Sequence, residues 1–286
     1  MSSGLQGAYL LRDSLGARFI LKWEAGATDL GRMPAVLGAL KRLREAGLPV
    51  PRYTAVGLCA TEPIGRYSIQ ELLPGDQPTR LDDWLLDRVI AANEAQSGIG
   101  MLEARPPRGW SVWLQDLTLG RRTEDFCQTR AMRAYSLESA RLLDAFQSLM
   151  RSNAGINLAE RDIVHFDFGV NQLLVRNVGT SRCRITGVVD WEGLVTGDRL
   201  FDLASLLFYA YSYRNQETSV VLRLWRYLVE TVGINVLSIY LVHLAQREID
   251  WCIRHESSES VREAWRLSTA VLSELESRSR WRLLAP

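Results

Sequence analysis

The stretch that most constrains this chain is Val164–Val175, which reads VHFDFGVNQLLV. An apolar lead-in delivers a His and then Asp167, and a short glycine-containing loop leads through two amide residues into a second apolar run. This pattern predicts a carboxylate and a metal-binding amide on a rigid loop between two buried strands. A second apolar run, Ile185–Glu192 (ITGVVDWE), also carries an acid, Asp190, after its strand-like part. Together the two stretches are typical of a phosphotransfer site, which needs an acid to orient the hydroxyl and oxygen ligands for Mg²⁺.

The composition is that of an ordinary folded protein. A chain of 286 residues with 47% apolar and 23% charged residues can bury a large core. The net charge of +1, without a dense run of Lys or Arg, argues against nucleic acid as a partner. The four cysteines are widely scattered, which favours core thiols over disulfides or zinc ligands. With no signal pattern at the start and no apolar run of membrane-spanning length, we expect a cytoplasmic protein without a membrane or an obligate protein partner.

The first part of the chain is predicted to be rich in strands. Ala8–Trp23 contains two apolar runs around an Asp-Ser-Leu-Gly cluster, which indicates a β-hairpin. Lys22 is a single cation in the second run. Further expected elements are a helix over Pro34–Ala46, an extended segment over Leu48–Arg52 and a strand over Tyr67–Leu73. The Pro74-Gly75 pair that follows is the best candidate boundary, so we expect one unit at 1–75 and a second at 76–286.

The second part is predicted to be mainly helical. Its expected helices are Leu81–Gln96, Ser136–Met150, Phe201–Tyr213, Val220–Val232, Val236–Arg254 and Ser260–Arg278. Gly98–Gly120 contains Pro, Gly and Trp residues and is predicted to be an irregular inserted loop. Within it, Trp110 and Trp113 are candidates to line a substrate pocket, and packing in the core is the alternative. The fold class predicted from these elements is α+β.

The spacing within the two acidic stretches assigns candidate roles. In protein kinases the catalytic Asp precedes a Mg²⁺-binding Asn by five residues. Five residues after Asp167 is Gln172, and Asn171 lies one position earlier, so either amide could serve. Asp190, at the end of a later strand, would hold the metal. Lys22 would contact the nucleotide phosphates, as the lysine of an early strand does in kinases.

Residues Val164–Ala204 resemble the paired signature of the aminoglycoside phosphotransferase and choline kinase-like family. That signature combines an HGDxxxxN loop with an (I/V)DWE…GDxxxDLA stretch, and hygromycin-type members carry a similar HxDFGxNN variant. FILKW, LPVPRY and YSIQELLPG fit the smaller lobe of the family more loosely. The resemblance implies a bilobal protein-kinase-like fold, with a small β-rich N-lobe, a larger helical C-lobe and ATP or GTP between them.

The resemblance also implies a role for each matching residue. Asp167 would be the catalytic base, Asp190 and Gln172 (or Asn171) would bind Mg²⁺, and Lys22 would contact the phosphates. The remaining positions are the hinge at Gln70, Glu71 and Leu72, whose backbone would meet the purine; Gly4 and Gly7 near the phosphates; and the structural residues His165 and Asp202. Asp198 is expected to cap the following helix. The helix after Lys22 lacks a well-placed Glu to pair with this lysine, which leaves Glu24, Asp29 and Glu45 as candidates.

The implied function is an ATP- or GTP-dependent O-phosphotransferase for a small-molecule hydroxyl, with an aminoglycoside or another antibiotic as the first acceptor. Glu192, Glu248 and Asp250 are acids that would suit a cationic acceptor, and for the last two an ordinary solvated helix face is the alternative. One alternative function is a metabolic kinase for an amino alcohol or sugar. The other is a nucleotide-binding pseudokinase or regulatory module, which the Gln at position 172 and the missing Glu would suit.

Overall fold

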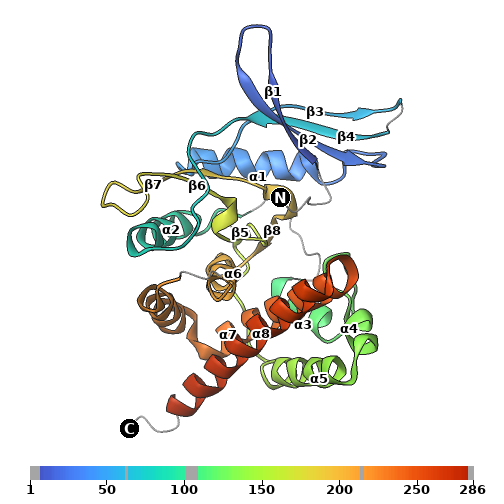
Figure 1. The fold of residues 1–286 in the computed structure, drawn as a ribbon, viewed down its shortest axis with the longest axis vertical. Helices are drawn as coiled ribbons and strands as arrows, with labels where there is room; N and C mark the ends of the chain where they lie inside the picture. Colours follow the sequence, from blue (N-terminus) through green and yellow to red (C-terminus); the bar gives the residue numbers. More distant parts are fainter. Residues whose placement is uncertain (1–6, 62–63, 101–108, 213–215, 283–286) are drawn as a thin grey trace.

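A four-stranded antiparallel sheet forms the first part of the chain. The computed structural model describes residues 7–61, 64–100, 109–212 and 216–282. Figure 1 shows the sheet above helix α1 (Met33–Glu45) and above the larger helical part. The strands are β1 (Gly7–Arg12), β2 (Arg18–Ala25), β3 (Tyr53–Cys59) and β4 (Gly65–Glu71), in the order β1-β2-β4-β3. The predicted α+β architecture, with a small strand-rich part and a larger helical part, is therefore confirmed.

The predicted hairpin is formed by β1 and β2, and Asp13 closes it. The Asp13 Oδ1 atom accepts hydrogen bonds from the backbone N–H groups of Leu15 at 2.9 Å and Ala17 at 2.8 Å. Gly16 has a φ of +88°, a conformation that glycine adopts without steric penalty. Strand β2 then pairs with β1 on one side and with β4 on the other. Lys22 therefore projects from an interior strand, whose backbone is held on both edges.

Two small sheets present the acidic stretches. Strand β5 (Asp162–Val164) pairs with β8 (Val195–Gly197), and β6 (Leu173–Arg176) pairs with β7 (Arg184–Val188). The loop from β5 to β6 contains Asp167 and a 3₁₀ turn, η1 (Val170–Gln172). The loop from β7 to β8 contains Asp190 and a second 3₁₀ turn, η2 (Trp191–Gly193). Both stretches thus lie on loops between strands, as the sequence predicts.

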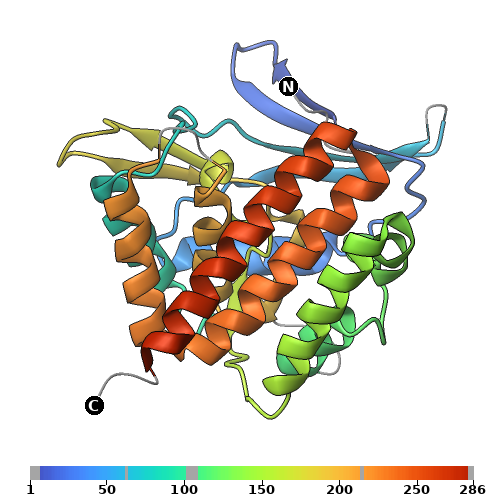
Figure 2. The ribbon, with the colours of Figure 1, turned by 60° about the horizontal axis from the view of Figure 1, so that its bottom comes forward.

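The helical part is built around a long helical hairpin. Its helices are α2 (Asp83–Ala95), α3 (Trp110–Thr118), α4 (Thr129–Tyr135), α5 (Leu137–Ser152), α6 (Leu200–Ala210), α7 (Thr218–His255) and α8 (Ser258–Arg282). Figure 2 shows α8 and the part of α7 that follows its kink lying side by side across this part of the molecule, while the first part of α7 runs apart from them. Residues of α6 and of the second half of α7 are almost all buried, so these two helices form the centre of the core.

The break predicted between Val220–Val232 and Val236–Arg254 is present as a kink, at which Gly233 has the non-helical angles φ 79° and ψ 158°. Helix α7 therefore consists of two helices that meet at this kink. By length and composition it could also cross a membrane, since one 18-residue window has a mean hydropathy of 1.6. The prediction that no such run exists is therefore corrected. However, 61% of that window is buried inside the protein, as in the core helix of a soluble protein.

The prediction of an irregular loop over Gly98–Gly120 is wrong for the second half of this segment, which forms a helix. Trp110–Thr118 forms helix α3, which begins directly after Gly109, a glycine with a φ of +81°. Trp110 is 1% exposed, and its ring centroid lies 5.2 Å from that of Phe201. Trp113 is 6% exposed. Both tryptophans are core residues rather than pocket residues, because the inner face of a short helix carries them into the interior.

The close packing of Trp110 generates a stability prediction. A Cβ atom at Gly197 in β8 would lie 2.6 Å from the Trp110 ring, whereas one at Gly155 would meet nothing within 4 Å. We expect Gly197→Ala to lower the free energy of unfolding by about 1–3 kcal/mol through overpacking. Gly155→Ala is the matched control and should change it by less than about 0.5 kcal/mol. Urea denaturation measures both, and equal stabilities of the two variants would contradict this packing.

Candidate active site

A buried carboxylate on α6 holds the loop that carries Asp167. Asp202 is 1% exposed, and its two oxygens accept hydrogen bonds from the backbone N–H groups of His165 at 2.8 Å and Phe166 at 3.0 Å. Burial raises the pKa of Asp202 to about 6, although His165 and these hydrogen bonds act in the opposite direction. These contacts agree with the bracing role predicted for Asp202.

His165 connects the two acidic stretches. Its ring is fully buried, and its Nε2 atom lies 2.8 Å from the carbonyl oxygen of Val189, the residue before Asp190. The ring centroid also lies 4.6 Å from that of Trp191. A buried side chain with these partners is not available to a substrate, which agrees with the structural role predicted for His165.

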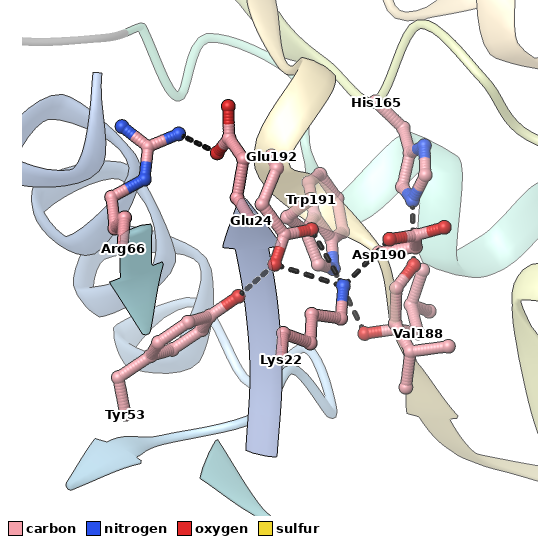
Figure 3. Close-up of polar contacts among 10 residues, drawn as sticks. Lys22, Glu24, Tyr53, Arg66, His165, Val188, Asp190, Trp191 and Glu192 are labelled. Atoms are coloured by element: carbon pink, nitrogen blue, oxygen red, sulfur yellow. Dashed lines mark hydrogen bonds and ion pairs between the residues drawn. The ribbon is translucent and has the colours of Figure 1, made fainter. Parts of the chain in front are cut away.

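Lys22 reaches from the sheet to the second acidic stretch. Its Nζ atom lies 2.6 Å from Oδ1 of Asp190 and 2.7 Å from Oε2 of Glu192 (Figure 3). Burial lowers the pKa of Lys22, but the charges of Glu192 and Asp190 outweigh burial and raise it above its usual value. For Asp190, the nearby Lys22 likewise outweighs burial and lowers the pKa of the carboxyl group. Lys22 and two acids about 170 residues further along the chain thus form one charged cluster.

Glu192 supplies the acidic partner of Lys22 that helix α1 lacks. In addition to its contact with the lysine, its Oε1 atom accepts a hydrogen bond of 2.8 Å from the Tyr53 hydroxyl (Figure 3). The candidate partners Glu24, Asp29 and Glu45 contact Arg66, the backbone of Gly31 and Lys41, respectively. In the sequence, the signal for this partner is Glu192 itself, an acid two positions after Asp190. From the sequence alone, Glu192 is instead assigned to the acceptor.

The two candidate amide ligands differ in their surroundings. The Oε1 atom of Gln172 accepts a hydrogen bond of 3.0 Å from the backbone N–H of Gly169, and its side chain is buried. Asn171 is exposed, and its backbone carbonyl accepts a hydrogen bond of 2.6 Å from the Gln77 side chain. Gln172 therefore holds its own loop together in this structure, while the Asn171 side chain lies on the surface.

The donor set at this cluster fits a divalent cation that also binds phosphates. Among the described residues, no group of three or more His, Cys, Asp or Glu side chains could hold a metal alone. Mg²⁺ is usually bound by one or two carboxylates together with substrate phosphates and water. The Asp190 carboxylate, which is 55% exposed, and an amide of the Asp167 loop meet that description.

The predicted hinge spans the end of strand β4. Gln70 is in β4 with its side chain buried, and the Glu71 N–H donates to the Arg52 carbonyl at 2.8 Å. Leu72 is the first residue after β4. Gly7 begins β1, and Gly4 lies outside the described residues.

Three further acids predicted from the sequence are engaged with protein groups. Asp198 accepts a hydrogen bond of 2.9 Å from the backbone N–H of Leu200, the first residue of α6, but the N-cap of this helix is Arg199, so the predicted capping position is corrected by one residue. Glu248 accepts one of 2.8 Å from the Tyr209 hydroxyl, and burial raises the pKa of Glu248. Asp250 is fully buried, pairs with Arg254 at 2.9 Å and accepts from the Gln128 N–H. Its carboxylate is therefore not available to an acceptor.

Asp167 itself is 60% exposed, and its partner is a residue that the sequence analysis missed. The Nη2 atom of Arg247, in α7, lies 3.0 Å from the Asp167 Oδ1 atom. The Nη1 atom donates a hydrogen bond of 2.7 Å to the carbonyl oxygen of Phe166. The only sequence signal was one cation within the apolar run LVHLAQRE of α7.

The fold and these motifs agree with a known family. The model described as "Phosphotransferase enzyme family" matches residues 2–232. The chain belongs to this family. The predicted resemblance is thereby confirmed, and the chain is a kinase-like phosphotransferase. A comparison with curated proteins finds no match.

Solved structures of several kinases and phosphotransferases have a similar fold. An amicoumacin kinase in complex with AMP-PNP, Ca²⁺ and Ami has 12% identity and a TM-score of 0.61, over 97% of this chain and 87% of that chain. An aminoglycoside-3'-phosphotransferase of type VIII has 20% identity and a TM-score of 0.53, over 86% and 90%. A choline/ethanolamine kinase family protein from Mesorhizobium loti has 15% identity and a TM-score of 0.56, over 92% and 89%. Identities this low show the bilobal protein-kinase-like fold alone.

The different surroundings of the two amides generate the next prediction. Gln172→Ala leaves the buried N–H of Gly169 without its acceptor, so we expect the free energy of unfolding to fall by about 1–3 kcal/mol. Asn171→Ala removes an exposed side chain and should change it by less than about 0.5 kcal/mol. Chemical denaturation of the two variants tests this. A larger loss for Asn171→Ala would show that the loop is held in another way.

Proposed function

We propose that this protein is an ATP- or GTP-dependent O-phosphotransferase that phosphorylates a hydroxyl group of a small molecule. The observation that carries the proposal is the cluster of Lys22, Asp190 and Glu192, within 2.6–2.8 Å, on loops and strands that flank the exposed Asp167. Phosphoryl transfer requires little more from a protein than positioned charge, and this cluster supplies charge of both signs. We place the activity in the cytoplasm, with no nucleic acid, membrane or obligate protein partner.

Each residue receives one role in this proposal. Asp167 orients the acceptor hydroxyl and takes its proton as the new O–P bond forms and the bond to the leaving nucleoside diphosphate breaks. Lys22 contacts the phosphates of the bound nucleotide, and Glu192 orients this lysine. The backbone at Gln70–Leu73 meets the purine.

The residues that would hold Mg²⁺ are Asp190 and one amide, either Gln172 or Asn171. When bound, the ion would neutralise charge on the phosphates. Titration of turnover with Mg²⁺ in the Gln172→Ala and Asn171→Ala variants assigns the amide. We expect Gln172→Ala to raise the Mg²⁺ concentration needed for half-maximal turnover more than Asn171→Ala does. The reverse order would make Asn171 the ligand.

Antibiotics are the first acceptor class to test, because two of the solved structures above are named an amicoumacin kinase and an aminoglycoside phosphotransferase. One observation favours a second class. Of the acids predicted to bind a cationic acceptor, Glu192 pairs with Lys22, Asp250 with Arg254, and Glu248 bonds Tyr209. A site whose acids are already engaged suits an acceptor with less positive charge than an aminoglycoside, such as a neutral sugar or an amino alcohol with a single positive charge.

The pseudokinase alternative loses part of its support. It depended on the missing acidic partner of Lys22, and Glu192 occupies that place at 2.7 Å. A largely buried lysine with a partly buried acidic partner is held in one position, which is what phosphate binding requires.

The decisive experiment is a turnover assay. The purified protein is incubated with Mg²⁺ and ATP or GTP, together with aminoglycosides, other hydroxylated antibiotics, choline and sugars, and release of the nucleoside diphosphate is followed. We expect turnover with at least one acceptor, and Asp167→Ala should reduce kcat by about 10²–10⁴-fold while nucleotide binding persists. Nucleotide binding without turnover across the panel would favour the pseudokinase. Failure to bind either nucleotide would exclude both functions.

The contacts of Glu192 generate a binding prediction. Glu192→Gln removes the charge that holds Lys22, and the lost charge-assisted contact should weaken nucleotide binding about tenfold. Glu24→Gln is the control, because Glu24 lies on the same strand as Lys22 but pairs with Arg66 (Figure 3). Calorimetric titration with ATP measures both. Equal affinities of the two variants would mean that Glu192 does not orient the lysine.

A further inference from the structure

Arg247 is a buried cation in a core helix. Its side chain is 8% exposed, and it lies in the part of α7 where nearly every residue is buried. Placing a guanidinium in such an environment costs several kcal/mol unless its charge and its N–H donors are paired. A chain has little reason to keep this residue for packing alone, since a Leu or Met would fill the same space without that cost. The partners of Arg247 therefore indicate what it does.

Two contacts of Arg247 are with Phe166 and Asp167, at the proposed catalytic position. One nitrogen donates to the carbonyl oxygen of Phe166 at 2.7 Å, and the other lies 3.0 Å from the Asp167 carboxylate. Arginine can make both contacts at once because its planar guanidinium presents two parallel donors. The guanidinium carbon also lies 4.9 Å from the centre of the Phe166 ring. One side chain thus holds both the backbone and the carboxylate of the loop.

Phe166 is in a conformation that needs such support. Its φ of +75° is in the left-handed region, which costs a residue with a Cβ atom of the order of 1–3 kcal/mol. Asp202 binds its N–H at 3.0 Å, and Arg247 binds its carbonyl oxygen. Phe201 stacks against the ring with a centroid distance of 5.3 Å. Phe166 is therefore held through its N–H, its carbonyl oxygen and its ring. Because Asp167 is the next residue, the conformation of Phe166 sets the direction in which Asp167 projects.

Charge balance around Arg247 supports the same reading. Burial lowers the pKa of Arg247, but Tyr209, Asp167 and Glu248 outweigh burial and raise it, so the guanidinium stays charged. Glu248 is not a direct partner, because its Oε2 atom accepts from the Tyr209 hydroxyl. The Asp167 carboxylate is the acid in direct contact with this cation among the described residues.

We propose that Arg247 is a positioning residue for phosphotransfer. It fixes one oxygen of Asp167 and leaves the second oxygen for the acceptor hydroxyl. The inference rests on the proposed function, since it assigns a role within that reaction. If the Asp167 carboxylate rotated freely, only a few of its orientations would place an oxygen next to the acceptor hydroxyl. Misplacement of a catalytic group by about 1 Å can lower the rate by about 10²-fold.

The chain offers a matched control for the test. Arg254, two turns further along α7, also holds a carboxylate through a largely buried ion pair, with Asp250 at 2.9 Å, but it does not contact the Asp167 loop. Arg247→Met and Arg254→Met therefore each break one ion pair in the same helix. Arg247→Lys keeps the charge but lacks the two-pronged geometry.

The first measurement needs neither nucleotide nor acceptor. Hydrogen exchange of the free protein should show faster exchange at residues 165–169 in Arg247→Met than in Arg254→Met. Because no reaction is involved, this result is independent of the proposed function. Unchanged exchange at residues 165–169 in Arg247→Met would overturn the positioning role, whether or not the acceptor is known.

The second measurement uses an acceptor that the wild-type protein turns over. Arg247→Met should lower kcat by about 10- to 100-fold with the nucleotide KM within about twofold, and Arg247→Lys should recover part of the loss. In an Asp167→Asn background the same substitution should have almost no effect, because the two residues act as a unit. Arg254→Met should leave kcat nearly unchanged in both backgrounds. Equal losses for both arginines, an additive double variant, or a raised kcat in Arg247→Met would contradict the inference.

Discussion

The structure depends on the buried carboxylate of Asp202, which bonds two successive backbone N–H groups at the start of the Asp167 loop. A buried carboxylate is costly, and burial raises its pKa to about 6, so its position has to be fixed by strong partners. Those partners are the backbone of His165 and Phe166, and their satisfaction lets Phe166 keep a positive φ. The loop is thereby tied to helix α6, which lies at the centre of the core. The most exposed acid of the site, Asp167, is presented by one of the most rigidly supported segments of the chain.

The site is held from two directions by ion pairs of different character. The cluster around Lys22 connects the sheet to the loop after β7, and its acids are partly exposed, with Asp190 at 55%. The Lys22–Asp190 pair has one partner that faces solvent and can exchange partners when a ligand arrives, whereas Glu192, at 18% exposed, keeps the lysine in place. Arg247 is 8% exposed and holds its loop from within the core. The arrangement therefore combines a partly exposed cluster at Lys22 with a pair at Asp167 whose cation is buried.

The parts of the site that could be predicted from the sequence are those encoded locally. Asp167 and Asp190 each follow an apolar strand at a recognisable spacing, and Lys22 lies in a hairpin strand with its own turn signal. The missed contacts are long-range: 170 residues separate Lys22 from Glu192, and 80 separate Asp167 from Arg247. No local pattern records such a pair, because only the packing of helices and sheets brings the residues together.

Helix α3 was missed for a related reason. Its Gly- and Pro-rich flank indicates a loop, and propensity of this kind is overridden by the burial of Trp110 against β8 and α6. The ring of Trp110 also lies 6.1 Å from that of Phe166, the residue that Arg247 and Asp202 support. Helix α3, which the sequence analysis missed, thus packs against the strained residue of the Asp167 loop. The core and the site therefore share the same side chains, because Trp110 and Phe201, which bury α3, also contact the ring of Phe166.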